Sequence, residues 1–168
     1  MFKNTFKISV LATALTTLIV FSCKTKQEIT TEDNAKLSVE FEKYELENGL
    51  DVILHQDKSD PIVSLAIQYG VGSNREKTGR TGFAHLFEHM LFQESENVPQ
   101  DQFFKKIQDA GGTLNGGTGR DGTTYYEVVP KNALETVLWL ESDRMGFLIN
   151  TVTESAFYNQ QEVVQNEK

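Results

Sequence analysis

The sequence has very few cysteines and an excess of acidic side chains, and both features exclude classes of chemistry. Cys23 is the only cysteine among 168 residues, so an intramolecular disulfide is impossible. Sixteen basic residues stand against 24 acidic ones, which gives a formal charge of -8 at pH 7. A chain with this charge disfavours nucleic acid as a partner, because phosphate binding requires positive surface. No internal repeat is present, and the length suits one modest domain.

Residues 1–22 have the pattern of a signal peptide. Two lysines precede an apolar run at 8–21, which is short for a membrane span. A small residue stands directly before Cys23, an arrangement that resembles the lipidation site of bacterial lipoproteins. The pattern predicts a chain held in the bacterial cell envelope, on the periplasmic or outer-membrane side, by a lipid on Cys23. An ordinary secretory signal with an incidental cysteine is the alternative.

The remaining chain divides into a polar segment and a folded region. Residues 23–37 are polar and charged, which predicts a flexible tether. Residues 38–168 carry the apolar patterning of a folded domain. No Gly or Pro stops the last predicted helix, so we expect a domain that is incomplete at its C-terminal end.

The folded region mixes strand and helix signals in a way that predicts an α+β fold, with a mainly antiparallel sheet packed with helices. Asn48-Gly49 lies between two apolar runs and predicts a β-hairpin. Thr153 is the predicted N-cap of the last helix, and Trp139 is expected in the core. Further strands are predicted at 62–73 and within 113–130, and helices at 82–92, 100–110, 131–149 and 155–168.

The segment FAHLFEHMLF at 83–92 places His85, Glu88 and His89 in an otherwise apolar run. On a helix each residue advances 100°, so the two histidines lie about 40° apart on one face. Two such imidazoles can bind one zinc ion, while Glu88 holds the water; this is the inverted zinc motif H-x-x-E-H. A pair of core histidines with a glutamate partner is the alternative, but the run offers few polar partners.

Longer stretches around this motif resemble the pitrilysin family of zinc metallopeptidases. The resemblance covers 38–168 and includes YELENGLDVILHQDKSDP, GRTGFAHLFEHMLFQESENVP, GGTLNGGTGRDGTTYYEVVP and QQEVVQNE, in the family's order. It implies the N-terminal catalytic half of such an enzyme, in truncated form. Enzymes of this family enclose the substrate between two related halves, which implies a homologous partner half on a longer chain or a separate subunit.

The resemblance also implies a third zinc ligand, a glutamate on a later helix. Glu162 and Glu167 are the two candidates, and VVQNE resembles the family's ligand segment, which selects Glu167. Glu162 lies about 140° away around the helix and is expected to face solvent. Many family members carry a second glutamate that steadies a histidine, where this chain has Gln160. An amide brings no charge, so we expect weaker support for the metal.

The glycine-rich stretch permits three interpretations. A phosphate-binding loop is disfavoured because the lysine and the setting of a P-loop are missing. In the family that the chain resembles, the corresponding strand lies at a sheet edge, where a peptide substrate adds as an extra strand. This implies substrate binding by Gly112, Thr113, Leu114 and Asn115. A glycine-rich turn that only packs is the remaining alternative.

These observations lead to the hypothesis of a zinc-dependent endopeptidase that acts on peptides or unfolded proteins. His85, His89 and Glu167 are expected to hold Zn²⁺, with Glu88 as the general base. Because no partner half is present, we expect the isolated chain to be weakly active or inactive. The alternatives are a lipid-anchored zinc-binding scaffold subunit that binds peptides, and a zinc hydrolase that acts on other bonds.

Overall fold

The computed structural model describes residues 38–167, which fall into two compact units divided after Gln56. The predictions for the signal peptide, Cys23 and the tether at 23–37 lie outside the described residues. Within the described part, no helix is long and apolar enough to cross a bilayer.

The described part of the first unit forms a β-hairpin. Strand β1 (Glu42–Glu45) pairs antiparallel with β2 (Asp51–Leu54), and Tyr44 stands opposite Val52. Gly49 adopts φ 86° in the connecting turn, a backbone conformation that glycine takes without strain. The Asn48 side chain accepts a hydrogen bond from the Leu50 N–H at 3.2 Å. The hairpin predicted from Asn-Gly is therefore confirmed.

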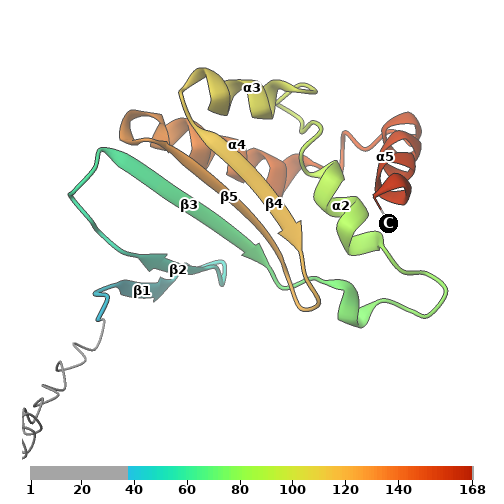
Figure 1. Ribbon diagram of the computed structural model, residues 1–168, viewed down its shortest axis with the longest axis horizontal. Helices are drawn as coiled ribbons and strands as arrows, with labels where there is room; N and C mark the ends of the chain where they lie inside the picture. Colours follow the sequence, from blue (N-terminus) through green and yellow to red (C-terminus); the bar gives the residue numbers. More distant parts are fainter. Residues whose placement is uncertain (1–37, 168) are drawn as a thin grey trace, which may run out of the picture. The chain divides into compact units, whose positions relative to one another are not determined.

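The second unit is built on a three-stranded antiparallel sheet with the order β3-β5-β4 (Figure 1). Its strands are β3 (Ile62–Tyr69), β4 (Thr113–Thr118) and β5 (Thr123–Pro130). Strand β5 is central and β4 lies at an edge. Strand β3 ends at Tyr69, earlier than predicted, because the chain bends at Gly70 and then passes close to Arg120 at Gly72. A Cβ there would lie 2.5 Å from the Arg120 carbonyl oxygen, so only glycine permits this approach.

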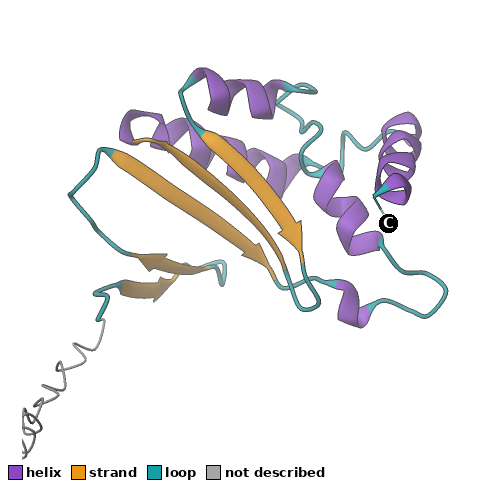
Figure 2. Ribbon diagram, in the orientation of Figure 1, coloured by secondary structure: helices purple, strands orange, loops and turns teal. Residues whose placement is uncertain are grey.

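Four α-helices of the described chain accompany the sheet, and Figure 2 shows them in purple beside the orange strands. They are α2 (Phe83–Met90), α3 (Gln102–Asp109), α4 (Leu134–Phe147) and α5 (Glu154–Asn166). Short 3-10 turns form η1 (Ser73–Arg75) and η2 (Lys131–Ala133), which precede α2 and α4. The mixed fold with antiparallel sheets agrees with the α+β prediction.

The apolar core lies between one face of the sheet and helices α3 and α4. Alternate residues of β5 are buried, as expected for a strand with one face in the core. The buried apolar cluster consists of Val98, Phe103, Ile107, Val129, Ala133, Val137 and Leu140. Trp139 was predicted in the core, but it is 42 % exposed. Residues at helical spacing, among them Val137 and Leu140, form the buried face of α4, and Trp139 lies on the other side.

A buried ionic cluster connects α4 to the sheet. Arg144 donates from Nε to Glu141 at 2.8 Å and from Nη2 to both Glu141 and Glu127. The guanidinium group also lies 4.1 Å from the Tyr125 ring centre and 4.5 Å from that of Phe103. Burial, together with the neighbouring Glu141 carboxylate, raises the pKa of Glu127 to about 9 although Arg144 opposes the shift. Glu127 therefore holds a proton at neutral pH.

Asp143, also on α4, fixes the loop that follows the motif helix. Its carboxylate accepts hydrogen bonds from the Ser95 hydroxyl at 2.5 Å and from the Asn97 side chain at 2.6 Å. Burial alone would raise the pKa of Asp143, but these hydrogen bonds outweigh it and lower the pKa. The loop after α2 is thereby held against α4 by a charged acceptor.

Candidate metal centre

Helix α2 carries the H-x-x-E-H motif, and its start is fixed by a carboxylate from the preceding loop. Glu76 accepts hydrogen bonds from the N–H groups of Gly82 at 2.7 Å and Ala84 at 2.8 Å. These are donors that a helix leaves without an intrahelical partner. Gly82 adopts φ 99°, which suits glycine. The first turn, which leads directly into His85, therefore has a defined backbone.

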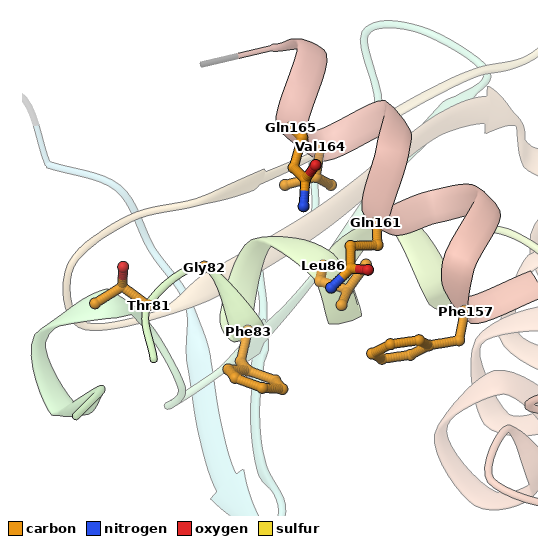
Figure 3. A pocket seen from close by; sticks show the side chains of 8 residues that line it. All are labelled: Thr81, Gly82, Phe83, Leu86, Phe157, Gln161, Val164 and Gln165. Atoms are coloured by element: carbon orange, nitrogen blue, oxygen red, sulfur yellow. The ribbon is translucent and has the colours of Figure 1, made fainter. Parts of the chain in front are cut away.

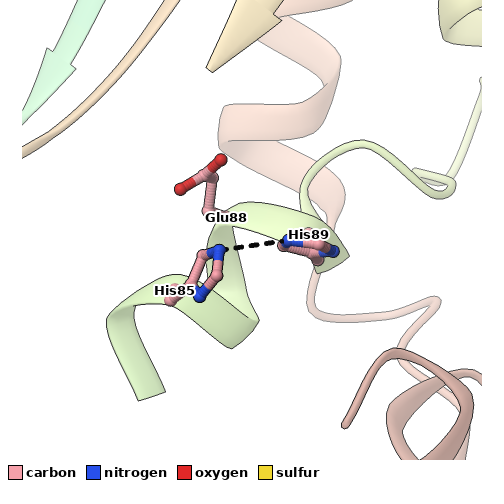
Figure 4. A group of neighbouring side chains, drawn as sticks. All are labelled: His85, Glu88 and His89. Carbon is pink, nitrogen blue, oxygen red and sulfur yellow. Dashed lines mark hydrogen bonds between the residues drawn. The ribbon is translucent and has the colours of Figure 1, made fainter. Parts of the chain in front are cut away.

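The two histidines present their Nε2 atoms to each other one helical turn apart. The Nε2 atoms of His85 and His89 lie 3.2 Å apart, and the rings meet nearly at right angles with centres 4.8 Å apart (Figure 4). Their side chains are 36 % and 19 % exposed, respectively. In Figure 4, Glu88 projects from the same helix in a different direction. The pair is thus partly open to solvent, although the surrounding sequence is apolar.

Glu167 comes from the end of α5 and completes a triangle with the Nε2 atoms of the two histidines. Its Oε2 lies 3.4 Å from Nε2 of His85 and 3.4 Å from Nε2 of His89. Helix α5 is set by the Thr153 side chain, which accepts from the Ala156 N–H at 3.2 Å, so the predicted N-cap is confirmed. Glu162, the other candidate, is exposed, and within the described residues the carboxylate that meets both histidines is that of Glu167.

The triangle fits a zinc ion in the chemistry of its donors and in its dimensions. Tetrahedral zinc with bonds of about 2.0–2.2 Å holds its ligand atoms roughly 3.3–3.6 Å apart. The three edges here measure 3.2, 3.4 and 3.4 Å. Two imidazole nitrogens and one carboxylate oxygen are a donor set that zinc prefers. The residues present therefore fit the metal without a further side chain.

Gln160 lies beside the metal site and orients one histidine. Its Oε1 is 3.3 Å from Nδ1 of His89, so that ring nitrogen donates to the amide oxygen. With the proton on Nδ1, the lone pair of Nε2 faces the triangle, which is the tautomer that a metal requires. Gln160 itself is 7 % exposed, and like Val164 it belongs to the buried side of α5. The amide therefore contacts the histidine, although it brings no charge.

Glu88 lies next to the triangle and contacts the sheet. It is 8 % exposed, and its Oε2 accepts a hydrogen bond from the Thr118 hydroxyl at 2.5 Å. Suitable atoms of His85, Glu88 and His89 all lie within 4.8 Å of one another. Thr118 was not singled out in the sequence, because nothing local in GGTLNGGTGR distinguishes it from the other threonines. Only its position as the last residue of β4 brings it to Glu88.

The expected substrate residues, Gly112 to Asn115, lie at the start of β4 or directly before it. Strand β4 pairs only with β5 among the described strands, and α2 packs near it. A Cβ on Gly112 would lie 2.6 Å from a Val129 methyl group, and one on Gly116 would lie 3.0 Å from the Phe92 ring. Packing explains these two glycines. A Cβ on Gly117 would meet nothing within 4 Å, so packing does not require glycine there.

A small cavity of about 90 Å³ lies on the seam between α2 and α5 (Figure 3). Phe83 and Leu86 of α2 and Phe157 of α5 line it, together with glutamine side chains of α5. The histidines, Glu88 and Glu167 are not among the residues that line this cavity. Its lining is mainly apolar and amide in character, unlike the imidazole and carboxylate groups of the triangle.

Comparison with known proteins decides the family. The pattern described as insulinase, peptidase family M16, matches residues 51–168, which is more than half of the chain. The chain belongs to this family. Relatives in the M16 family are named as zinc proteases, and zinc is accordingly the metal that the donor set of this chain fits.

Individual M16 relatives resemble this chain over most of its length. A zinc protease, PqqE, from Helicobacter pylori is 30 % identical over 128 residues, which cover 76 % of this chain and 28 % of that protein. The mitochondrial-processing peptidase subunit beta of Dictyostelium discoideum is 30 % identical over 127 residues, covering 75 % and 26 %. The crystal structure of pitrilysin matches with a TM-score of 0.69 and 25 % identity, over 79 % of this chain and 14 % of that one. The chain thus spans less than a third of the length of each.

Proposed function

We propose that this M16 chain supplies the zinc centre of an endopeptidase, with His85, His89 and Glu167 as ligands and Glu88 as the general base. The observation that carries the proposal is the triangle of acceptor atoms with edges of 3.2, 3.4 and 3.4 Å, with a buried carboxylate beside it. Acceptor atoms gathered at this spacing, from imidazole and carboxylate groups, are suited to a metal.

The chain's own residues carry the proton transfers of the reaction. Zinc, when bound, acidifies the attacking water and polarises the scissile carbonyl group. Glu88 accepts one proton from that water as the water oxygen bonds to the carbonyl carbon. Glu88 then returns the proton to the leaving nitrogen as the C–N bond breaks, which yields a carboxylic acid and an amine. The remaining proton of the acid passes to the amine, so the final products are a carboxylate and an ammonium group. Gln160 keeps the His89 ring oriented throughout.

Strand β4 is the proposed binding place of the peptide substrate. Its edge away from β5 presents backbone donors and acceptors to which an extended peptide can add as another strand. Backbone pairing of this kind makes little demand on side chains, which suits a peptide or an unfolded protein. The packing of α2 near β4 supports this proposal, because the same edge then lies near the catalytic helix.

A homologous partner half forms part of the proposal. The chain spans 28 % of its H. pylori relative, and another relative is named as a subunit of a processing peptidase. We expect the isolated chain to hydrolyse peptides weakly or not at all until a partner half encloses the substrate. Anchoring in the bacterial envelope through Cys23 is also proposed, on the sequence pattern of residues 1–23 alone.

The test is the Glu88→Gln variant of the full chain, supplied with a homologous half if turnover requires it, with Glu162→Gln as the matched surface control. We expect both to bind about one zinc per chain, because neither residue is a ligand. Hydrolysis of an unfolded protein should fall by roughly 1,000-fold or more in Glu88→Gln and stay unchanged in the control. Parent-level hydrolysis by Glu88→Gln would refute the assignment of the base.

The same assay separates the alternatives. Cleavage of small esters or amides with no action on unfolded protein would favour a hydrolase for other bonds. A zinc-loaded parent chain that binds peptide but gains no activity with a homologous half would favour the scaffold subunit.

A further inference from the structure

Thr118 joins the proposed substrate strand to the proposed general base. It is the last residue of β4, and its hydroxyl donates to Glu88 Oε2 at 2.5 Å. A hydrogen bond to an ionised acceptor is among the stronger kinds, and this distance lies at the short end for a hydroxyl donor. Glu88 is buried, so water competes little for the contact.

A second threonine holds Thr118 in place. Thr123 stands directly opposite Thr118 in the sheet, and the two hydroxyl oxygens lie 3.1 Å apart. The Thr123 hydroxyl donates to the Val71 carbonyl oxygen at 2.9 Å, so its single hydrogen is already used. The hydrogen of Thr118 is therefore directed at the carboxylate, which is a stronger acceptor than a hydroxyl.

The Val71 backbone, which accepts the hydrogen bond from Thr123, is itself held in place. The backbone after Val71 packs against the turn between β4 and β5, where the Ser73 N–H donates to the Gly119 carbonyl at 3.1 Å. The Asn74 N–H donates to the Arg120 carbonyl at 2.9 Å. Thr118 and Thr123 lie at the two ends of that turn, so the hydroxyl groups sit on a rigid part of the sheet.

The carboxylate of Glu88 needs such a contact. The α2 backbone fixes where the side chain begins, but rotation about the last side-chain bond of a glutamate is broad. Within the described residues, only Oε2 of Glu88 has a hydrogen-bond partner, and that partner is Thr118. The contact holds one oxygen on the sheet side and leaves Oε1 for the water that is to be deprotonated.

We infer that Thr118 is a positioning residue for the reaction, because its hydroxyl holds the Glu88 carboxylate in one orientation. The same hydrogen bond links β4, the proposed substrate strand, to the general base. This inference rests on the proposed endopeptidase function. When Glu88 holds the proton during turnover, the Thr118 hydrogen can turn to the Thr123 oxygen, so neither hydroxyl loses its partner. The pair thus accommodates both stages of the reaction.

The experiment compares four variants of the zinc-loaded full chain, supplied with the homologous half if turnover requires it. Thr118→Val keeps the shape but removes the hydroxyl, and Thr118→Ser restores it. Thr124→Val is the matched control, because it removes a threonine hydroxyl from the neighbouring strand without touching Glu88. Glu88→Gln marks the loss of the base. We measure zinc content, thermal unfolding, kcat and KM for each variant. We also measure the Kd of a peptide hydroxamate, because this probe contacts both the metal and the base.

We expect Thr118→Val to keep its zinc and its melting temperature while kcat falls about 10- to 100-fold with KM nearly unchanged. Hydroxamate affinity should weaken about 10-fold, which gives a readout that needs no turnover. Thr118→Ser should recover most of both losses, and Thr124→Val should match the parent.

Parent-like kcat and hydroxamate affinity in Thr118→Val, with Glu88→Gln impaired, would overturn the inference and leave the proposed function intact. Failure of Thr118→Ser to recover either value would also overturn it. Parent-level hydrolysis by Glu88→Gln, or a parent chain without zinc, would instead overturn the proposed function, and the inference with it.

Discussion

The protein contains two clusters of ionisable side chains, the metal centre and the buried ionic cluster, which differ in solvent exposure and in whether the protein itself supplies a cation. At the metal centre, His85 and Glu167 are 36 % and 47 % exposed, and the three atoms that form the triangle are of types that can each donate a lone pair to a metal. In the ionic cluster, Arg144, Glu141 and Glu127 are at most 2 % exposed. There Arg144 is the cation, and the rings of Tyr125 and Phe103 pack against its guanidinium group.

This difference in exposure and in charge balance distinguishes the metal centre, which can bind an ion from solvent, from the ionic cluster, which is structural. Arg144 donates to the Glu141 carboxylate and to the protonated Glu127 side chain, so one buried cation meets one buried anion and the charge is balanced within the protein. The three atoms of the metal centre face one another without a cation of the protein between them, and the partial exposure of their side chains gives an ion access. A perturbed pKa alone would have selected Glu127, whose role here is structural; the geometry of acceptors selects the functional cluster.

The largest effect is expected from removing the cation of the ionic cluster. Arg144→Ala leaves the Glu141 carboxylate buried without its partner, which should cost about 3–5 kcal/mol of the free energy of unfolding. Urea denaturation measures this loss, and Arg75→Ala, which changes an arginine of the η1 turn outside the cluster, should alter stability by less than about 0.5 kcal/mol. A comparable, small loss for both variants would contradict a stabilising role for the cluster.

The next effect is expected at the metal centre and leaves the fold in place. Glu167→Gln should weaken zinc affinity by about 100-fold or more, because even side chains that only support a metal ligand contribute 10- to 100-fold. Glu162→Gln, on the same helix but exposed, should bind zinc like the parent. Competition with a chelator measures both constants. Equal affinities in the two variants would exclude Glu167 as the third ligand.

The smallest effect is expected in the pH dependence of stability. Because the pKa of Glu127 is raised to about 9 in the folded chain, the folded state keeps a proton that the unfolded state loses above about pH 5. The free energy of unfolding should therefore fall as pH rises from about 5 to 9. Glu127→Gln mimics the protonated form and should flatten this decline by on the order of 1–3 kcal/mol.

Thermal unfolding measured between about pH 5 and 9 gives the slope of the free energy of unfolding against pH. Glu162→Gln, which changes an exposed carboxylate, should keep the slope of the parent. An unchanged slope in Glu127→Gln would assign the decline to another group.

Local sequence patterns predicted the elements that depend on near neighbours. Asn-Gly indicated the hairpin, Thr153 the start of α5, and the spacing of His85 and His89 their common face. Boundaries and burial were less predictable. Strand β3 ends at Tyr69, and the close approach of Gly72 to Arg120 that follows is not encoded in the local sequence. The exposure of Trp139 follows from which side of α4 meets the sheet, a choice made by packing.

The sequence by itself determined the chemistry of the metal site, because helical periodicity aligns two imidazoles four residues apart whatever surrounds them. Resemblance to a family pointed to Glu167, but the distances of 3.4 Å exist only because α5 packs on α2. The tertiary structure alone decided the contacts of Thr118 with Glu88 and of Arg144 with Glu127. These pairs come from elements far apart in the chain, and a local sequence pattern carries no information about which distant side chain will fill a hydrogen-bonding position.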